Sequence, residues 1–156
     1  MTVRLAGAAD LEAVIQLERA TANAPHWAAS EYAAMLVPAS ASGEVRRCLF
    51  VAESELGLIG FAVGKVIGIG LESSSELESV AVGSTARRAG VGRALCAAVI
   101  GWCRAQGTAA IELEVRAASA GAIALYSSLG FAVEGRRPRY YQEPADDAVL
   151  MRLKLA

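Results

Sequence analysis

Glycines and arginines are concentrated in the stretch RRAGVGRA, residues 87–94, which directly precedes an apolar segment with helical spacing. The first backbone N–H groups of a helix have no partner within the helix, and they carry the positive end of its dipole. Gly90 and Gly92 would allow a ligand to approach these N–H groups closely. The stretch therefore predicts a binding site for a phosphate or pyrophosphate at the start of a helix.

Three phosphate-binding patterns can be compared with this stretch. A P-loop requires a Lys after its glycines, and none follows here. A dinucleotide fingerprint requires a third small residue where Leu95 stands, and it follows the first strand of a domain, whereas several predicted strands precede this loop. The third pattern is Q/R-x-x-G-x-G/A, in which x is any residue. Arg87, Gly90 and Gly92 match its three specified positions. Taken alone, the stretch also fits a basic helix start with incidental glycines.

Two pairs of carboxylates and a tyrosine flank the glycine loop. Glu76 and Glu78 alternate in ELESVAV, and Glu112 and Glu114 alternate in IELEVR, so each pair would share one face of a strand. Tyr126 follows in the helical segment ALYSSLGF. Together with the glycine loop, these segments resemble the GNAT acetyltransferases, and most of all the RimI-type ribosomal-protein-alanine N-acetyltransferases.

The resemblance covers roughly residues 10–155, and it is strongest from 76 to 131. It implies that acetyl-CoA is the cosubstrate and that its acetyl group passes to the N-terminal α-amine of a protein, such as a ribosomal protein with an N-terminal Ala. This transfer needs a proton acceptor for the incoming ammonium and a proton donor for the leaving thiolate. The resemblance implies Glu114 as the acceptor, directly or through a water, and Tyr126 as the donor.

Each of these roles has a plainer alternative. Glu114 would otherwise be a solvated or salt-bridged strand carboxylate, and Tyr126 a core aromatic residue with a satisfied hydroxyl. Glu76 is a reserve base, or it only makes the substrate groove acidic.

Cofactor contacts are implied for three regions. The backbone of the strand before the loop would bind the pantetheine arm, the loop and helix start the pyrophosphate, and the start of the last helix the pantetheine again. In this sequence these positions are Val80, Ala81 and Val82; Arg88, Ala89, Gly90, Val91, Gly92 and Arg93; and Ser119. The family commonly has Asn where Ser119 stands, so its shorter side chain predicts weaker binding or a water in the gap.

Two segments, APHW at 24–27 and residues 136–155, resemble the substrate loops of the RimI-type subgroup. The resemblance implies that the first residues of the acceptor contact Trp27, Glu76, Tyr140 and Tyr141. The two tyrosines also fit an ordinary aromatic pair at the edge of a strand.

The fold of this family serves many acceptors, so alternatives to a protein N-terminus stay open. One is an acetyltransferase of a small-molecule amine or a lysine side chain. A different class is an acyl-CoA-binding regulatory module without turnover, which the presence of both acid and base disfavours. A covalent route through Cys48, Cys96 or Cys103 is not expected, because none of them has a His partner.

The composition limits the class of protein and its partners. The chain has 156 residues, 54% of them apolar and 20% charged, with a formal net charge of −1. We therefore expect one globular domain, residues 1–156, with no nucleic-acid or membrane partner. No secretory signal is visible, and the odd number of cysteines lacks metal-ligand spacing, so we expect reduced thiols, a cytoplasmic location and no metal. We also expect a monomer or weak dimer.

Periodicity and turn residues predict eleven elements that position these residues. Strands are expected at residues 2–6, 48–54, 58–69, 76–82, 109–116, 131–137 and 147–155, and helices at 10–22, 30–36, 91–106 and 119–130. Asp10, Ser30 and Ser119 are the expected N-caps, and Gly107 and Gly130 the expected glycines at helix ends. The order predicts an α/β (α+β) domain with one sheet and helices on both faces. The resemblance implies a GNAT-like sheet that is mixed and mostly antiparallel.

Overall fold

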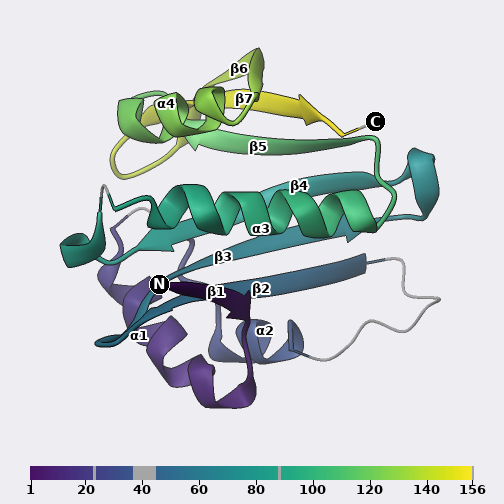
Figure 1. Cartoon of the computed structure of the whole chain (residues 1–156). Coiled ribbons are helices and arrows are strands. Elements are labelled where there is room, and N and C mark those ends of the chain that lie inside the picture. The colour runs from purple at the N-terminus through teal and green to yellow at the C-terminus, as the bar shows by residue number, and fades with distance from the viewer. Residues whose placement is uncertain (23, 37–44, 88, 156) are drawn as a thin grey trace.

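The computed structural model describes residues 1–22, 24–36, 45–87 and 89–155 (Figure 1). Its strands are β1 Thr2–Leu5, β2 Val45–Ser54, β3 Gly57–Ile67, β4 Ser74–Val82, β5 Ala110–Arg116, β6 Ala132–Tyr141 and β7 Asp146–Lys154. Its α-helices are α1 Leu11–Ala20, α2 Ala29–Ala34, α3 Val91–Ala105 and α4 Ala120–Ser128. Short 3-10 turns lie at Ala8–Asp10, Gly70–Glu72 and Ser84–Ala86.

The strands form one sheet in the order β1-β2-β3-β4-β5-β7-β6. Neighbouring strands are antiparallel except β4 and β5, which are parallel. The element order and the mixed, mostly antiparallel sheet confirm the prediction from the sequence.

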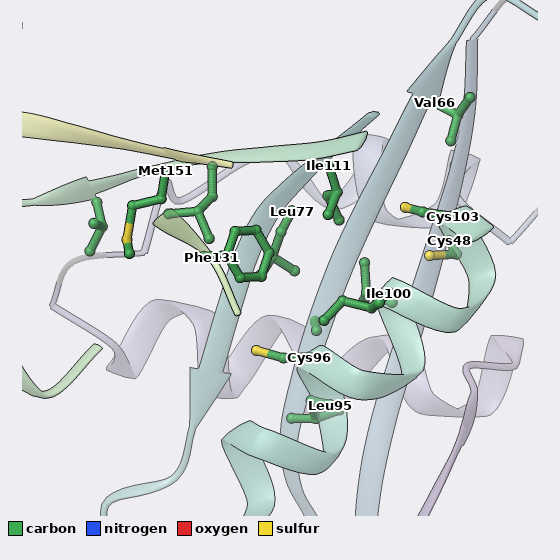
Figure 2. Packing of buried hydrophobic residues seen from close by; sticks show 14 of the residues in the cluster. Cys48, Val66, Leu77, Leu95, Cys96, Ile100, Cys103, Ile111, Phe131 and Met151 are labelled. Atoms are coloured by element: carbon green, nitrogen blue, oxygen red, sulfur yellow. The ribbon is translucent and has the colours of Figure 1, made fainter. Parts of the chain in front are cut away.

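Alternation along the strands divides the apolar side chains between the two faces of the sheet. On one face, α1 and α2 close a smaller core that contains Val14, Tyr32, Met35, Leu49, Val51, Phe61, Val63 and Ala81. On the other face, α3 and α4 close a larger core, in which side chains of α3 pack against Leu77 of β4, Ile111 of β5 and Phe131 (Figure 2). Helices therefore cover both faces, as predicted, and Figure 1 shows α3 lying along β3 and β4.

Two glycines of β3 allow α3 to lie very close to the sheet. A Cβ atom at Gly64 would stand 2.7 Å from Cγ1 of Val99 and 2.9 Å from Sγ of Cys48. A Cβ atom at Gly60 would stand 3.1 Å from Cγ1 of Val91, the first residue of α3. These close approaches fix the height of α3 above β3 and β4.

The expected helix ends are partly confirmed. Gly107 and Gly130 follow α3 and α4 with φ of +85° and +101°, the left-handed conformation that glycine favours at a helix end. Ser30 is not a cap, because α2 begins at Ala29 after the extended Ala28. Asp10 precedes α1, but its carboxylate accepts hydrogen bonds from Arg4 and from the backbone N–H of Gly7, and none from the first turn of α1.

The limits of β6 differ most from the sequence prediction. The strand continues to Tyr141, four residues past its predicted end at 137, because Tyr141 pairs with Asp146 after an irregular stretch. Among the helices that the structure describes, none has the length and apolarity needed to cross a membrane.

Candidate active site

The parallel strands β4 and β5 separate partway along their length. They pair only at Ser75 with Ile111 and at Glu76 with Glu112. On the other side of β4, the register against β3 shifts so that Glu78 becomes an extra residue, which is a β-bulge. Arg47 of β2 binds the bulged Glu78, with 2.9 Å between Nε and Oε1.

The bulge leaves the second half of β4 without a strand partner on its β5 side. This half contains Val80, Ala81 and Val82, the residues expected to bind a cofactor through their backbone. Unpaired backbone N–H and C=O groups need another hydrogen-bond partner. The opening between β4 and β5 therefore offers such groups to an extended, amide-containing ligand.

The start of α3 lies beside this opening and has the features predicted for a phosphate site. Gly90 precedes α3 with φ +78°, and the first helical hydrogen bond runs from Ala94 N–H to Gly90 O at 3.0 Å. The N–H groups of Val91, Gly92 and Arg93 therefore precede the first helical bond and are free of helical partners. No atom of the described residues lies within 4 Å of a Cβ atom built on Gly90, which leaves space for a ligand on this side of the backbone.

Gly92 contributes in a different way from Gly90. A Cβ atom at Gly92 would lie 3.3 Å from Cδ2 of Leu125 and 3.7 Å from Cγ2 of Val82. The missing side chain thus lets the start of α3 pack closely between the end of β4 and α4. This close packing is a role that the sequence did not reveal.

The remaining predicted cofactor residues differ in what the structure shows. Arg88 lies outside the described residues, and Ala89 is exposed. Arg93 Nη1 donates a hydrogen bond to Ser128 Oγ at 2.8 Å, so this side chain bridges α3 and α4. Ser119 precedes α4 as predicted, but its hydroxyl makes no capping hydrogen bond.

A groove of about 300 Å³ is lined by residues of β3, β4, β5, β7 and β6. Leu77, Ile111, Leu113 and Val115 belong to the larger core, so Glu76, Glu112 and Glu114 face the side that carries α1 and α2. The groove is lined by Lys65, Ile67, Ser74, Ser75, Glu76, Glu112, Leu113, Glu114, Glu134, Arg137, Leu150 and Met151. Four carboxylates face two cations, a formal excess of two negative charges, so the groove favours a cationic ligand.

Glu76 lies at the centre of a row of charged residues across the sheet. Its register partners are Lys65 on β3 and Glu112 on β5. Burial raises the pKa of Glu76, and the charges of Glu78, Glu114 and Glu112 raise it further, while Lys65 opposes the change. Among the described residues no ion pair reaches Glu76, so its carboxyl binds a proton more readily than an exposed glutamate does.

Two residues of β6, Arg137 and Tyr140, lie beside Glu114. Its Oε1 lies 3.4 Å from Nη1 of Arg137. A hydrogen bond with Glu114 is the main reason why the pKa of Tyr140 is raised. The guanidinium of Arg137 also lies 5.5 Å from the centre of the Tyr140 ring. The structure therefore places Glu76 and Glu114 in the lining of the groove and Tyr140 beside Glu114. Their roles in catalysis and acceptor binding stay predictions.

Tyr141 is anchored beside this group. The Tyr141 ring packs edge-on against the Tyr140 ring, with 5.1 Å between the ring centres. The Arg116 guanidinium lies 4.4 Å from the centre of the Tyr141 ring. Arg116 Nη1 also donates to Pro144 O at 2.8 Å, which fixes the turn between β6 and β7. Burial is the main cause that raises the pKa of Tyr141, and the charges of Glu114 and Tyr140 raise it further.

Tyr126 is half-buried on α4, on the face of the sheet opposite the carboxylates. Its ring packs edge-on against Phe131 at 6.0 Å. Burial is the main cause that raises the pKa of Tyr126, followed by Cys96 and Tyr141. Its hydroxyl therefore stays protonated at neutral pH and is able to donate a hydrogen bond or a proton.

Trp27 packs against the smaller core and does not line the groove. Its ring centre lies 5.7 Å from that of Tyr32, in the core that also contains Ala81 of β4. Arg19 Nη2 donates to Trp27 O at 2.7 Å, which ties the connection after α1 to the helix itself. Contact between Trp27 and an acceptor stays a prediction.

Several residues of the site were not found from the sequence. Lys65, Glu134 and Arg137 line the groove, and Arg116 orients Tyr141. Arg137 belongs to the stretch RRPRYY, in which the resemblance implies a binding role only for the tyrosines. The available signal for a role of Arg137 was its position three residues before the tyrosine pair. The local sequence does not indicate that this residue lies beside Glu114.

Comparison with known proteins identifies the family. Residues 11–131 match the acetyltransferase (GNAT) family. The chain is 38% identical over 101 residues to the [ribosomal protein bS18]-alanine N-acetyltransferase of Escherichia coli K12, covering 64% of this chain and 66% of that protein. It is 39% identical over 105 residues to an uncharacterized protein of Mycobacterium leprae, covering 67% of this chain and 28% of that protein. The chain thus spans less than two thirds of the length of these relatives.

Solved structures agree with the family match. The crystal structure of the ribosomal-protein-S18-alanine N-acetyltransferase from Escherichia coli aligns with a TM-score of 0.79 at 30% identity, covering 99% of this chain and 94% of that one. A ribosomal-protein-alanine N-acetyltransferase from Brucella melitensis aligns with a TM-score of 0.79 at 27% identity, covering 99% of both chains. The predicted fold and the resemblance to RimI-type proteins are confirmed. This chain belongs to the GNAT family of acetyltransferases.

Proposed function

We propose that this protein transfers an acetyl group from acetyl-CoA directly to the N-terminal α-amine of a protein. The observation that carries the proposal is the opening between β4 and β5. Next to it lies a helix start with free N–H groups, and on the other face of the sheet lies an acidic groove. An anionic cosubstrate and a cationic acceptor would thus meet from opposite faces of one sheet.

The residues of this chain fit acetyl-CoA at two points. The N–H groups of Val91, Gly92 and Arg93 suit a pyrophosphate, since no acidic side chain lies in the first turn of α3. The unpaired backbone of Val80–Val82 suits the amides of the pantetheine arm. Arg88, Ala89 and Ser119 remain proposed contacts by their position in the chain.

Proton transfer in the proposed reaction uses the groove and α4. The acceptor arrives as an ammonium and must lose a proton before its nitrogen attacks the thioester carbonyl carbon. We assign this proton to Glu114, with Glu76 as the reserve base, because both carboxylates line the groove. As the C–N bond forms and the C–S bond breaks, Tyr126 gives its proton to the leaving sulfur.

Direct transfer is supported by the state of the cysteines. Burial raises the pKa of Cys48 and of Cys96 to about 12 and that of Cys103 to about 11. The reactive form of cysteine is the thiolate, which is scarce at neutral pH when the pKa is this high. These residues are therefore poor nucleophiles, and we propose no acetyl-cysteine intermediate.

The acceptor class is supported by charge and by similarity. The negative excess of the groove attracts an α-ammonium. The Escherichia coli relative is named as an alanine N-acetyltransferase of a ribosomal protein, and we propose the N-terminal α-amine of a protein as the acceptor here. We further propose a single domain, residues 1–156, and a cytoplasmic location. The continuous sheet and the three free thiols support these two proposals. The expected monomer or weak dimer stays a prediction.

Acetylation of matched peptides, measured by mass spectrometry, tests the proposal. One peptide begins with a free Ala and contains a Lys, a second has the same sequence with a methylated, tertiary α-amine, and a small diamine is the third acceptor. We expect one acetyl group on the α-amine of the first peptide only. Acetylation of the Lys in the second peptide, or faster turnover of the diamine, would replace the proposed acceptor by one of the alternatives. Acetyl-CoA binding without any product would indicate a regulatory module.

A further inference from the structure

We propose that Arg137 is an internal cation of the acceptor groove, which competes with the acceptor for Glu114 and thereby sets the affinity for cationic acceptors. The inference rests on the proposed function, because it takes the groove as the acceptor site. It assigns Arg137 a specificity-determining role that the sequence did not indicate.

The geometry places Arg137 where an acceptor ammonium would bind. Its Nη1 lies 3.4 Å from Glu114 Oε1, and its side chain lines the groove. The guanidinium also lies 5.5 Å from the centre of the Tyr140 ring, so it is adjacent both to the carboxylate and to an aromatic residue of the proposed acceptor site. A cation bound to Glu114 has to share this space with Arg137.

The other charges of the groove are arranged differently. Glu134 and Glu112 both lie near Arg152 of β7, at 3.7 Å and 4.0 Å. Glu76 has Lys65 as its neighbour in the adjacent strand. Glu114 is thus the groove carboxylate whose ion-pair partner comes from β6, the strand at the edge of the sheet.

The pair between Arg137 and Glu114 is weak enough to be displaced. The Arg137 side chain is 55% exposed and that of Glu114 26% exposed. Pairs of this exposure contribute little to stability, because water screens the charges and the long side chain loses freedom. An acceptor ammonium can therefore replace the guanidinium at Glu114, at a cost that appears as a higher KM for the acceptor.

The competition predicts the effect of removing the charge. In Arg137→Gln, Glu114 has no internal cation, and we expect the KM of the Ala peptide to fall about two- to five-fold, the range that corresponds to an exposed ion pair. Arg137→Lys keeps the charge and should restore a KM close to that of the wild type. The KM of acetyl-CoA should not change, because the groove does not include the start of α3.

Arg136→Gln is the matched control. It removes the same charge from the neighbouring position of β6, but Arg136 pairs with Asp147 at 2.7 Å and does not line the groove. Its acceptor KM should equal that of the wild type. Thermal unfolding of all variants separates a loss of folding from an effect on KM.

The outcomes distinguish this inference from the proposed function. If the wild type acetylates no peptide α-amine, the proposed function is wrong. If the wild type is active but Arg137→Gln leaves the acceptor KM unchanged, Arg137 is no competitor. A raised KM in Arg137→Gln would show that Arg137 binds the acceptor, which would also overturn the inference, as would an equal decrease in Arg136→Gln.

Discussion

Gly60 of β3 lies against both parts of the proposed acetyl-CoA site, the backbone of β4 and the start of α3. The variant Gly60→Ala tests whether this close packing positions the two parts. A Cβ atom at this position would stand 2.9 Å from Ala81 O of β4, 3.0 Å from Leu95 Cδ1 and 3.1 Å from Val91 Cγ1. Ala81 O is a backbone atom of a central strand, so it cannot move away as a side chain does. The added methyl group must therefore push α3 away from β4 or distort both.

The expected magnitude follows from overpacking. Inserting a methyl group into a filled core costs roughly 1–3 kcal/mol of unfolding free energy. The displacement moves Ala81 and Val91 apart, and these residues belong to the proposed pantetheine and pyrophosphate contacts. We therefore expect weaker acetyl-CoA binding as well. If the variant relieves about 1 kcal/mol of strain by moving these contacts apart, binding must restore that strain, and the Kd of acetyl-CoA rises about five-fold.

Urea unfolding and calorimetric titration with acetyl-CoA measure the two effects. Gly101→Ala on α3 is the matched control, since no atom in the described part of the chain lies within 4 Å of its Cβ position. It should gain about 0.5–1 kcal/mol of stability, as expected for Gly to Ala within a helix, and leave binding unchanged. Wild-type stability and wild-type affinity in Gly60→Ala would refute the reasoning.

Three further predictions concern single residues of the site. Gly90→Ala should lose about 1–2 kcal/mol of unfolding free energy in urea, because the φ of Gly90 is +78°. Gly90→Asn should lose less, because Asn tolerates this conformation. Equal losses in the two variants would contradict this account. Tyr126→Phe should lower kcat about 100-fold or more without changing acetyl-CoA affinity in steady-state and binding assays, and an unchanged kcat would exclude the hydroxyl as the acid. The pKa of Glu76 is raised above 4.5, so its contribution to stability is complete below that value and is lost as the pH rises through the folded pKa. Glu76→Gln should therefore unfold at higher urea than the wild type at pH 7 but not at pH 4, and a difference that is the same at both pH values would contradict the shift.

The element order could be predicted from local patterns. Apolar alternation and helical spacing gave the strands and helices in their correct order, because these periods reflect which side chains face a core. Limits were less accurate, as β2 begins at Val45 and not at 48, and β6 extends to Tyr141. Both strands continue because a neighbouring strand supplies hydrogen bonds, which local sequence does not reveal.

The capping residues show the same limit. Asp10 and Ser119 stand at the expected positions, yet neither side chain caps its helix. Asp10 binds Arg4 instead, a partner from β1 that forms a bidentate pair with it at 2.7 and 2.9 Å. The same carboxylate also accepts the backbone N–H of Gly7 at 2.7 Å, so Asp10 bonds to β1 and to the preceding 3-10 turn and leaves the start of α1 without a side-chain cap.

The sequence by itself determined the helix start with Gly90, the alternating carboxylates of β4 and β5, and the family. These features are local, since a conformation or a strand face depends on residues a few positions apart. Only the tertiary structure decided that Glu78 bulges and parts β4 from β5, that burial raises the pKa of Glu76, and that Arg137 reaches Glu114. Each of these depends on strands that are distant in the chain and adjacent in the sheet, because pairing, burial and charge act through space.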